Sequence, residues 1–116
     1  MGGPSATRPR RHTAESLQIT IRAQNVEVTA AQRVYIERRV ALSLSRFGEK
    51  IGRVTVDCSD VGDASGGKGK RCQIEVALPR AVRVQDTDPD LARAVRRATD
   101  RALRSVARAL ALDSGV

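Results

Sequence analysis

The stretch "RVTVDCSDVGDASGGKGKRCQIEVAL", residues 53–78, decides the fold. Both of its ends alternate apolar and polar residues, which is the period of a half-buried strand. The glycine-rich, charged middle predicts a flexible hairpin tip. A hairpin centred near Ser65 sets three pairs opposite one another on the buried face: Val54 with Val76, Val56 with Ile74, and Cys58 with Cys72. Because one register satisfies every apolar pair, we expect two antiparallel strands here.

A strand and a helix are predicted before this hairpin. "LQITIRA" (17–23) alternates, and Val26 and Val28 would extend that strand past a bend at Asn25. Thr29 with Gln32 three residues later is a capping-box signature for a helix start. The helix has an apolar stripe and would end at Gly48; the stripe consists of Ile36, Val40, Leu44 and Phe47. Arg38, Arg39 and Arg46 lie off this stripe, so we expect them to be solvated.

A fourth strand and a second helix are predicted after the hairpin. "AVRVQ" (81–85) offers a short strand with Val82 and Val84 facing inward. Asp88 is suited to the N-cap of the last helix and Pro89 to its first turn. The order β-α-β-β-β-α predicts an α+β sandwich, a four-stranded and mostly antiparallel sheet with two helices packed on one face.

The last helix is charged on one side. Its small apolar residues form a stripe suited to packing on the sheet, whereas six arginines occupy an arc of about 140° opposite that stripe: Arg93, Arg96, Arg97, Arg101, Arg104 and Arg108. Asp100 is the only acid in this segment. Like charges three to four residues apart repel, which favours an anionic partner over a merely solvated face.

Composition supports one basic domain. The chain has 116 residues and a net charge of +8, with eighteen arginines and three lysines. A GC-rich genome is one source of such arginine usage, and phosphate binding is another. Tyr35 and Phe47 are the only aromatic residues, which disfavours base-specific reading of single strands. We expect a disordered basic tail at residues 1–16, a domain at 17–112 and a C-terminal tail at 113–116. No apolar run is long enough for a membrane span.

No catalytic or metal-binding group is predicted. His12 is the only histidine and lies in the expected tail. Cys58 and Cys72 are expected to be buried thiols rather than a disulfide. Asp57, Asp60 and Asp63 match no calcium-loop pattern, and "GGKGK" (66–70) lacks the spacing of a phosphate-binding loop. We therefore expect no enzyme, no cofactor and no small-molecule substrate.

Four segments in this order resemble the ribosome hibernation-promoting factor family, also called ribosome-associated inhibitor A or sigma-54 modulation proteins. They are "ITIRAQNVEVT", "YIERRVALSLSRFGEKI", "GGKGKRCQIEV" and "TDPDLARAVRRATDRALRSVAR". The resemblance covers about residues 17–112 and implies a short form without the second, C-terminal domain of longer members. It also implies a fold like that of double-stranded-RNA-binding domains.

The resemblance implies a function and a set of contacts. Family members bind the small ribosomal subunit in the channel for mRNA and tRNA, inhibit translation and preserve idle ribosomes in the cytoplasm. Arg39, Arg101, Lys70 and Arg71 stand at basic positions of the family pattern. With the charged faces, the expected 16S rRNA contacts are Arg38, Arg39, Arg46, Lys70, Arg71, Arg93, Arg97, Arg101, Arg104 and Arg108. A monomer is expected off the ribosome; the alternatives are a regulator acting by protein contact and a general binder of duplex RNA or DNA.

Overall fold

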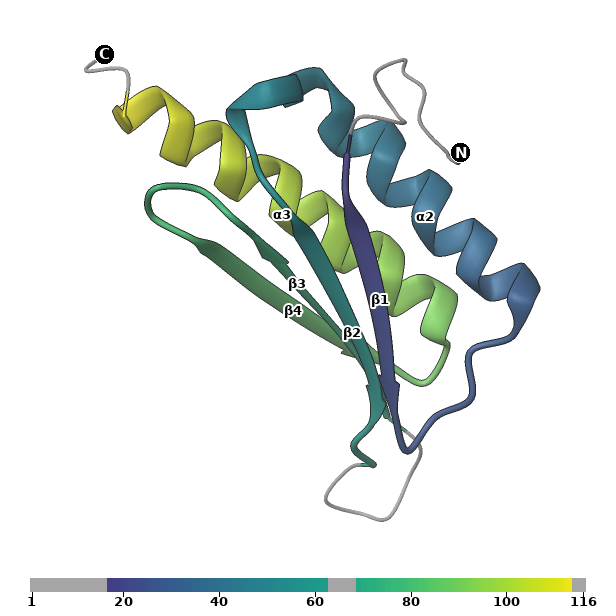
Figure 1. Ribbon diagram of the computed structural model, residues 1–116. Helices are drawn as coiled ribbons and strands as arrows, with labels where there is room; N and C mark the ends of the chain where they lie inside the picture. The colour runs from purple at the N-terminus through teal and green to yellow at the C-terminus, as the bar shows by residue number, and fades with distance from the viewer. Residues whose placement is uncertain (1–16, 63–68, 114–116) are drawn as a thin grey trace, which may run out of the picture.

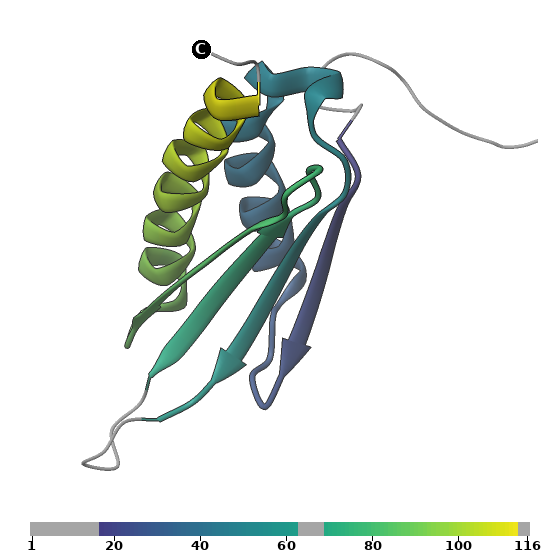
Figure 2. The ribbon, with the colours of Figure 1, turned by 90° about the vertical axis from the view of Figure 1, so that its left-hand side faces the viewer.

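The computed structural model describes residues 17–62 and 69–113, which form two layers. A four-stranded sheet forms one layer, and two long helices cover one of its faces (Figures 1 and 2). The predicted order β-α-β-β-β-α and the α+β class are confirmed. The elements are β1 (Ile19–Gln24), α2 (Ala30–Leu44), the 3-10 segment η1 (Ser45–Lys50), β2 (Val54–Asp60), β3 (Lys70–Val76), β4 (Val82–Asp88) and α3 (Leu91–Asp113). The predicted N-terminal tail, the hairpin tip and residues 114–116 lie outside the described residues.

The strands follow one another across the sheet in the order β1-β2-β3-β4. β1 runs parallel to β2, while β2 with β3 and β3 with β4 are antiparallel. The predicted hairpin register is confirmed at all three pairs, Val54 with Val76, Val56 with Ile74, and Cys58 with Cys72. All six side chains are buried, because the period of a strand places them together on the face that the helices cover.

The core lies between the sheet and the helices. α2 contributes Ile36, Val40 and Leu44. α3 contributes small residues that let its backbone lie close to β3 and β4: Ala94, Val95, Ala98, Ala102 and Val106. Thr99 of α3 is also buried, and its hydroxyl donates to the Val95 carbonyl at 2.7 Å. The predicted packing stripe of the last helix is therefore confirmed.

Two predicted boundaries of the first half are wrong. β1 ends at Gln24, because Asn25 has a positive φ of 57° that turns the chain away. Val26 and Val28 pack against the core without belonging to a strand. The capping box of Thr29 is confirmed, but α2 ends at Leu44 and the chain continues as η1. Gly48, with φ 53°, lies inside η1, in a region of backbone space that favours glycine.

The start of α3 also differs from the prediction. Asp90, not Asp88, is the N-cap: its carboxylate accepts from the Ala92 N–H at 3.0 Å and its carbonyl accepts from the Ala94 N–H. Asp88 is the last residue of β4, and its Oδ2 accepts from the Asp90 N–H at 2.8 Å. The second oxygen of Asp88 is thereby left to face α3.

Candidate nucleic-acid interface

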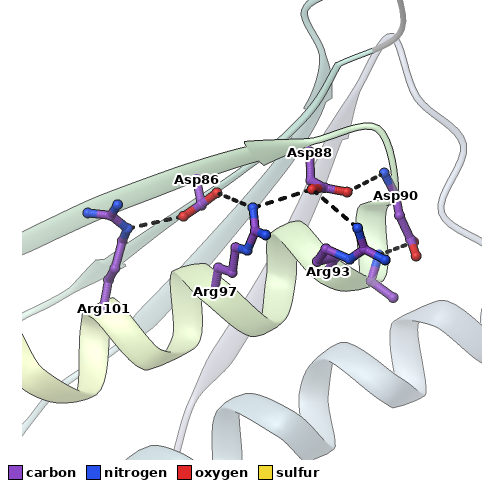
Figure 3. Close-up of polar contacts among 7 residues, drawn as sticks. Asp86, Asp88, Asp90, Arg93, Arg97 and Arg101 are labelled. Atoms are coloured by element: carbon purple, nitrogen blue, oxygen red, sulfur yellow. Dashed lines mark hydrogen bonds and ion pairs between the residues drawn. The ribbon is translucent and has the colours of Figure 1, made fainter.

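Three arginines of α3 contact two aspartates of β4 (Figure 3). The Arg101 Nε donates to Asp86 Oδ2 at 3.1 Å. Arg97 Nη1 lies 3.3 Å from Asp88 Oδ1 and 3.9 Å from Asp86 Oδ1. Arg93 Nη1 lies 3.9 Å from the same oxygen of Asp88. These contacts form one ladder along the seam between the helix and the edge strand.

The ladder exists because β4 continues past its two valines. Val82, Val84, Asp86 and Asp88 alternate along one face of the strand, so both aspartates face the helix layer. The side chains of Asp86 and Asp88 are only 13% and 8% exposed, whereas those of Arg97 and Arg101 are 51% and 57% exposed. The arginines thus cover the carboxylates and still present N–H donors to solvent. Two acids of β4, outside the segment in which Asp100 is the only acid, therefore partly neutralise the arginine arc.

The remaining arginines of α3 form a second class. Arg96, Arg104 and Arg108 are exposed, and none of them forms an ion pair with another side chain that the structure describes. We call Arg93, Arg97 and Arg101 the paired arginines and these three the unpaired arginines. The unpaired set holds the uncompensated positive charge of the helix.

The basic residues of α2 and η1 differ in burial. Arg38 and Arg46 are exposed, as expected. Arg39 is half-buried, and its Nε is buried without a hydrogen-bond partner, so the expectation that it is solvated is wrong. The physical reason is that α2 packs against α3 as well as the sheet: Tyr35, one turn earlier on the same side, lies in a shallow hollow with Leu91 and Val95 of α3.

Lys70 and Arg71, adjacent in β3, point to opposite faces of the sheet. Lys70 lies on the helix side, where its Nζ contacts Asp60 Oδ2 at 3.0 Å and its side chain is 20% exposed. Arg71 lies on the open face, half-buried, beside Arg22 and Gln73. The two residues therefore do not form one contact surface.

Two ion pairs compensate part of the positive charge on the open face of the sheet. Arg22 donates from Nε and Nη2 to the two oxygens of Asp57 at 2.9 and 3.2 Å, and this bidentate contact raises the pKa of the Arg22 guanidinium. Arg83 contacts Glu75 at 3.4 Å. The helix layer, not this face, therefore presents the excess of unpaired arginines.

The two cysteines are buried free thiols, as expected. A hydrogen bond between them lowers the pKa of Cys58 and raises that of Cys72, and burial raises both. Within residues 17–62 and 69–113, no cluster of three His, Cys, Asp or Glu side chains is arranged to hold a metal ion. Nor does any helix in these ranges combine the length and apolar character needed to cross a lipid bilayer.

A family model described as sigma 54 modulation protein / S30EA ribosomal protein matches residues 19–111. The chain belongs to this family. The match covers all four strands, all of α2 and α3 as far as residue 111, so the resemblance of the sequence segments is confirmed and the chain is a member of a ribosome-associated family.

Solved structures agree with this membership. The N-terminal domain of Protein Y from Thermus thermophilus is 34% identical, with a TM-score of 0.65, covering 78% of this chain and 97% of that chain. A ribosomal subunit interface protein from Coxiella burnetii is 15% identical, with a TM-score of 0.67, covering 81% of this chain and 98% of that chain, and shows the shared fold. No curated protein sequence matches the chain.

Proposed function

We propose that this S30EA-family protein binds 16S rRNA in the mRNA and tRNA channel of the small ribosomal subunit and inhibits translation, holding idle ribosomes in reserve. The observation that carries the proposal is the family match across residues 19–111. In this proposal the protein is a cytoplasmic, non-enzymatic factor that is monomeric off the ribosome. Its partner is the rRNA backbone rather than a small molecule.

The charge distribution suits this partner. Arginine binds phosphate through two parallel hydrogen bonds, and the unpaired arginines are free of competing carboxylates among the described residues. A protein with two aromatic residues has little capacity for base stacking, so recognition would rest on shape and phosphate contacts.

We assign the expected contacts different roles. Arg104 and Arg108, with the exposed Arg38 and Arg46, are the proposed phosphate contacts, and Arg96 joins them. The paired arginines contribute through their outward N–H groups. Arg39 is half-buried with its Nε covered, so it would reach a phosphate through its other guanidinium nitrogens. Lys70 is paired with Asp60, and Arg71 lies on the open face of the sheet. Both would therefore contribute less to rRNA binding than the arginines of the helices.

Sedimentation of the protein with purified ribosomes tests the proposal. At low salt it should sediment with small subunits and whole ribosomes, and ribosomes carrying it should no longer accept mRNA or initiator tRNA. Failure to sediment with either particle would overturn the proposal. Nuclease-resistant capture of a protein partner would instead favour regulation by protein contact, and equal affinity for any RNA or DNA duplex would favour a general binder.

A further inference from the structure

A hollow lies between the turn that joins β3 to β4 and the C-terminal half of α3. Its volume is about 210 Å³, and it is lined by Arg80 from the turn and by Ser105, Arg108, Ala109 and Leu112 from the helix. Each of the four helical residues lies three or four positions from another of them, so they share one side of α3. Figure 1 shows the turn and the end of α3 at the same end of the molecule. Two segments far apart in sequence thus place two guanidinium groups around one space.

The turn that carries Arg80 is held in place by the backbone. The Ala77 N–H donates to the Arg53 carbonyl at 2.9 Å, and the Gly52 N–H donates to the Ala77 carbonyl at 2.8 Å. A Cβ atom on Gly52 would lie 3.2 Å from that of Ala77, so the two segments are closely packed. The start of the turn is therefore fixed on the segment that leads into β2 before any ligand binds, and this preorganisation reduces the entropic cost of binding.

The charge in this hollow is not compensated by the described side chains. Arg80 and Arg108 are exposed, and neither forms an ion pair with a described residue, in contrast to the paired arginines a few turns away. The lining residues include no acid. Ser105 adds a hydroxyl that can donate a hydrogen bond, and Ala109 and Leu112 give the hollow one apolar wall.

We propose that Arg80, Ser105 and Arg108 form a phosphate-binding pocket. Two guanidinium groups and one hydroxyl match the oxygens of a tetrahedral phosphate, for which the planar fork of arginine is well suited. The same chemistry serves a backbone phosphate of RNA or a free phosphate-bearing ligand. The first case rests on the proposed function, and it would extend the rRNA contact from α3 onto the β3–β4 turn.

Titration of the whole protein with inorganic phosphate at constant ionic strength, followed by backbone amide NMR, tests the pocket. Saturable shifts should centre on Arg80, Ser105 and Arg108. Arg80→Ala and Arg108→Ala should each weaken phosphate binding by about tenfold or more, as expected for loss of a charge-assisted hydrogen bond. Arg83→Ala is the matched control: it removes the same charge from the same hairpin but on the open face, and it should leave the affinity unchanged.

The proposed pocket would be overturned if the amide shifts centred on other residues, or if Arg83→Ala lost as much phosphate affinity as Arg80→Ala and Arg108→Ala. Ribosome sedimentation of Arg80→Ala distinguishes the two sources of phosphate. Weaker sedimentation, with a salt dependence reduced by about one phosphate contact, supports an rRNA phosphate. Saturable phosphate binding combined with unchanged sedimentation supports a free ligand instead. If the wild-type protein does not sediment with ribosomes but still binds phosphate here, the proposed function fails and the pocket stands.

Discussion

Arg97 of α3 and Asp88 of β4 are joined across the helix–strand seam, with Nη1 3.3 Å from Oδ1. The carboxylate is almost covered, while about half of the arginine side chain remains exposed. One guanidinium can therefore neutralise a nearly buried acid and still present donors outward. Asp86 repeats this arrangement with Arg101, so the two aspartates both fix the helix on the sheet and reduce the positive charge of its outer side.

Replacing both acids, as Asp86→Asn with Asp88→Asn, should strengthen ribosome binding and weaken the fold. The net charge rises by two, and the paired arginines lose their competing carboxylates, so sedimentation should persist to higher salt. Neutral hydrogen bonds replace charge-assisted ones, which should lower the free energy of unfolding by about 1–3 kcal/mol. Sedimentation over a salt series and urea denaturation measure the two effects.

Asp100→Asn is the control for this pair. Asp100 is exposed on the same helix and has no contact with the ladder. The Asp100→Asn substitution should raise ribosome affinity slightly through overall charge and leave the free energy of unfolding within about 0.5 kcal/mol of the wild-type value. A fall in ribosome affinity for the double variant would mean that the aspartates position the arginines for RNA rather than compete with it.

The two classes of arginine should separate in a matched pair of triple variants. Arg96→Ala with Arg104→Ala and Arg108→Ala should reduce the salt dependence of ribosome binding by about two to three units, since up to three phosphate contacts are lost. Its urea midpoint should stay near that of the wild type, because these side chains contact no described acid.

The triple variant of the paired arginines should instead lose stability. Arg93→Ala with Arg97→Ala and Arg101→Ala removes the same charge but leaves two largely buried carboxylates without the arginines that pair with them. Its unfolding free energy should fall by roughly 3 kcal/mol, in the range seen when a buried pair loses one partner. Equal stability of the two triple variants would contradict the division of the α3 arginines into paired and unpaired classes.

The hairpin register could be predicted because it depends only on local rules. Alternation with a period of two fixes which residues of β2 and β3 face the core, and one register satisfies every apolar pair. Nothing outside the hairpin is needed to choose it. The capping box of Thr29 is predictable for the same reason, since both partners lie within one turn.

The ladder could not be predicted because it depends on a contact between two elements. Asp86 and Asp88 occupy inward positions of β4, where apolar residues are the norm, so the apolar alternation of "AVRVQ" ends before them. Only the packing of α3 beside β4 shows that arginines compensate their charge. The predicted N-cap is wrong for a related reason: Asp88 and Asp90 both suit a cap, and the tertiary contacts of Asp88 decide between them.

Thr29→Ala should destabilise the protein by about 1 kcal/mol through the loss of its N-cap bond. The Thr29 hydroxyl accepts from the Gln32 N–H at 3.1 Å, and the Gln32 side chain accepts from the Thr29 N–H at 2.9 Å. Urea denaturation measures the loss. Gln32→Ala, which keeps the hydroxyl, should cost less, and the double variant should cost less than the sum, because the two bonds form one motif. Strictly additive losses of stability in the two single variants would contradict coupling between the two hydrogen bonds of the capping box.

Stability should fall as the pH rises above about 8.5, the ordinary pKa of a cysteine thiol. In the unfolded chain both thiols ionise near that pH. In the folded protein Cys58 ionises first, and its hydrogen bond with Cys72, together with burial, raises the pKa of Cys72. The folded state then holds one more proton than the unfolded state, so the stabilising contribution of Cys72 is complete below pH 8.5 and is lost as the pH rises.

Urea denaturation between pH 7.5 and 9.5 under reducing conditions checks this expectation. The free energy of unfolding should fall by about 1.4 kcal/mol per pH unit at the upper end of this range, the value for one proton. Cys58→Ala with Cys72→Ala should be less stable at pH 7.5, because buried volume is lost, but its stability should not change across the range. A wild-type profile as flat as that of the double variant would show that Cys72 ionises as readily in the folded protein as in the unfolded chain.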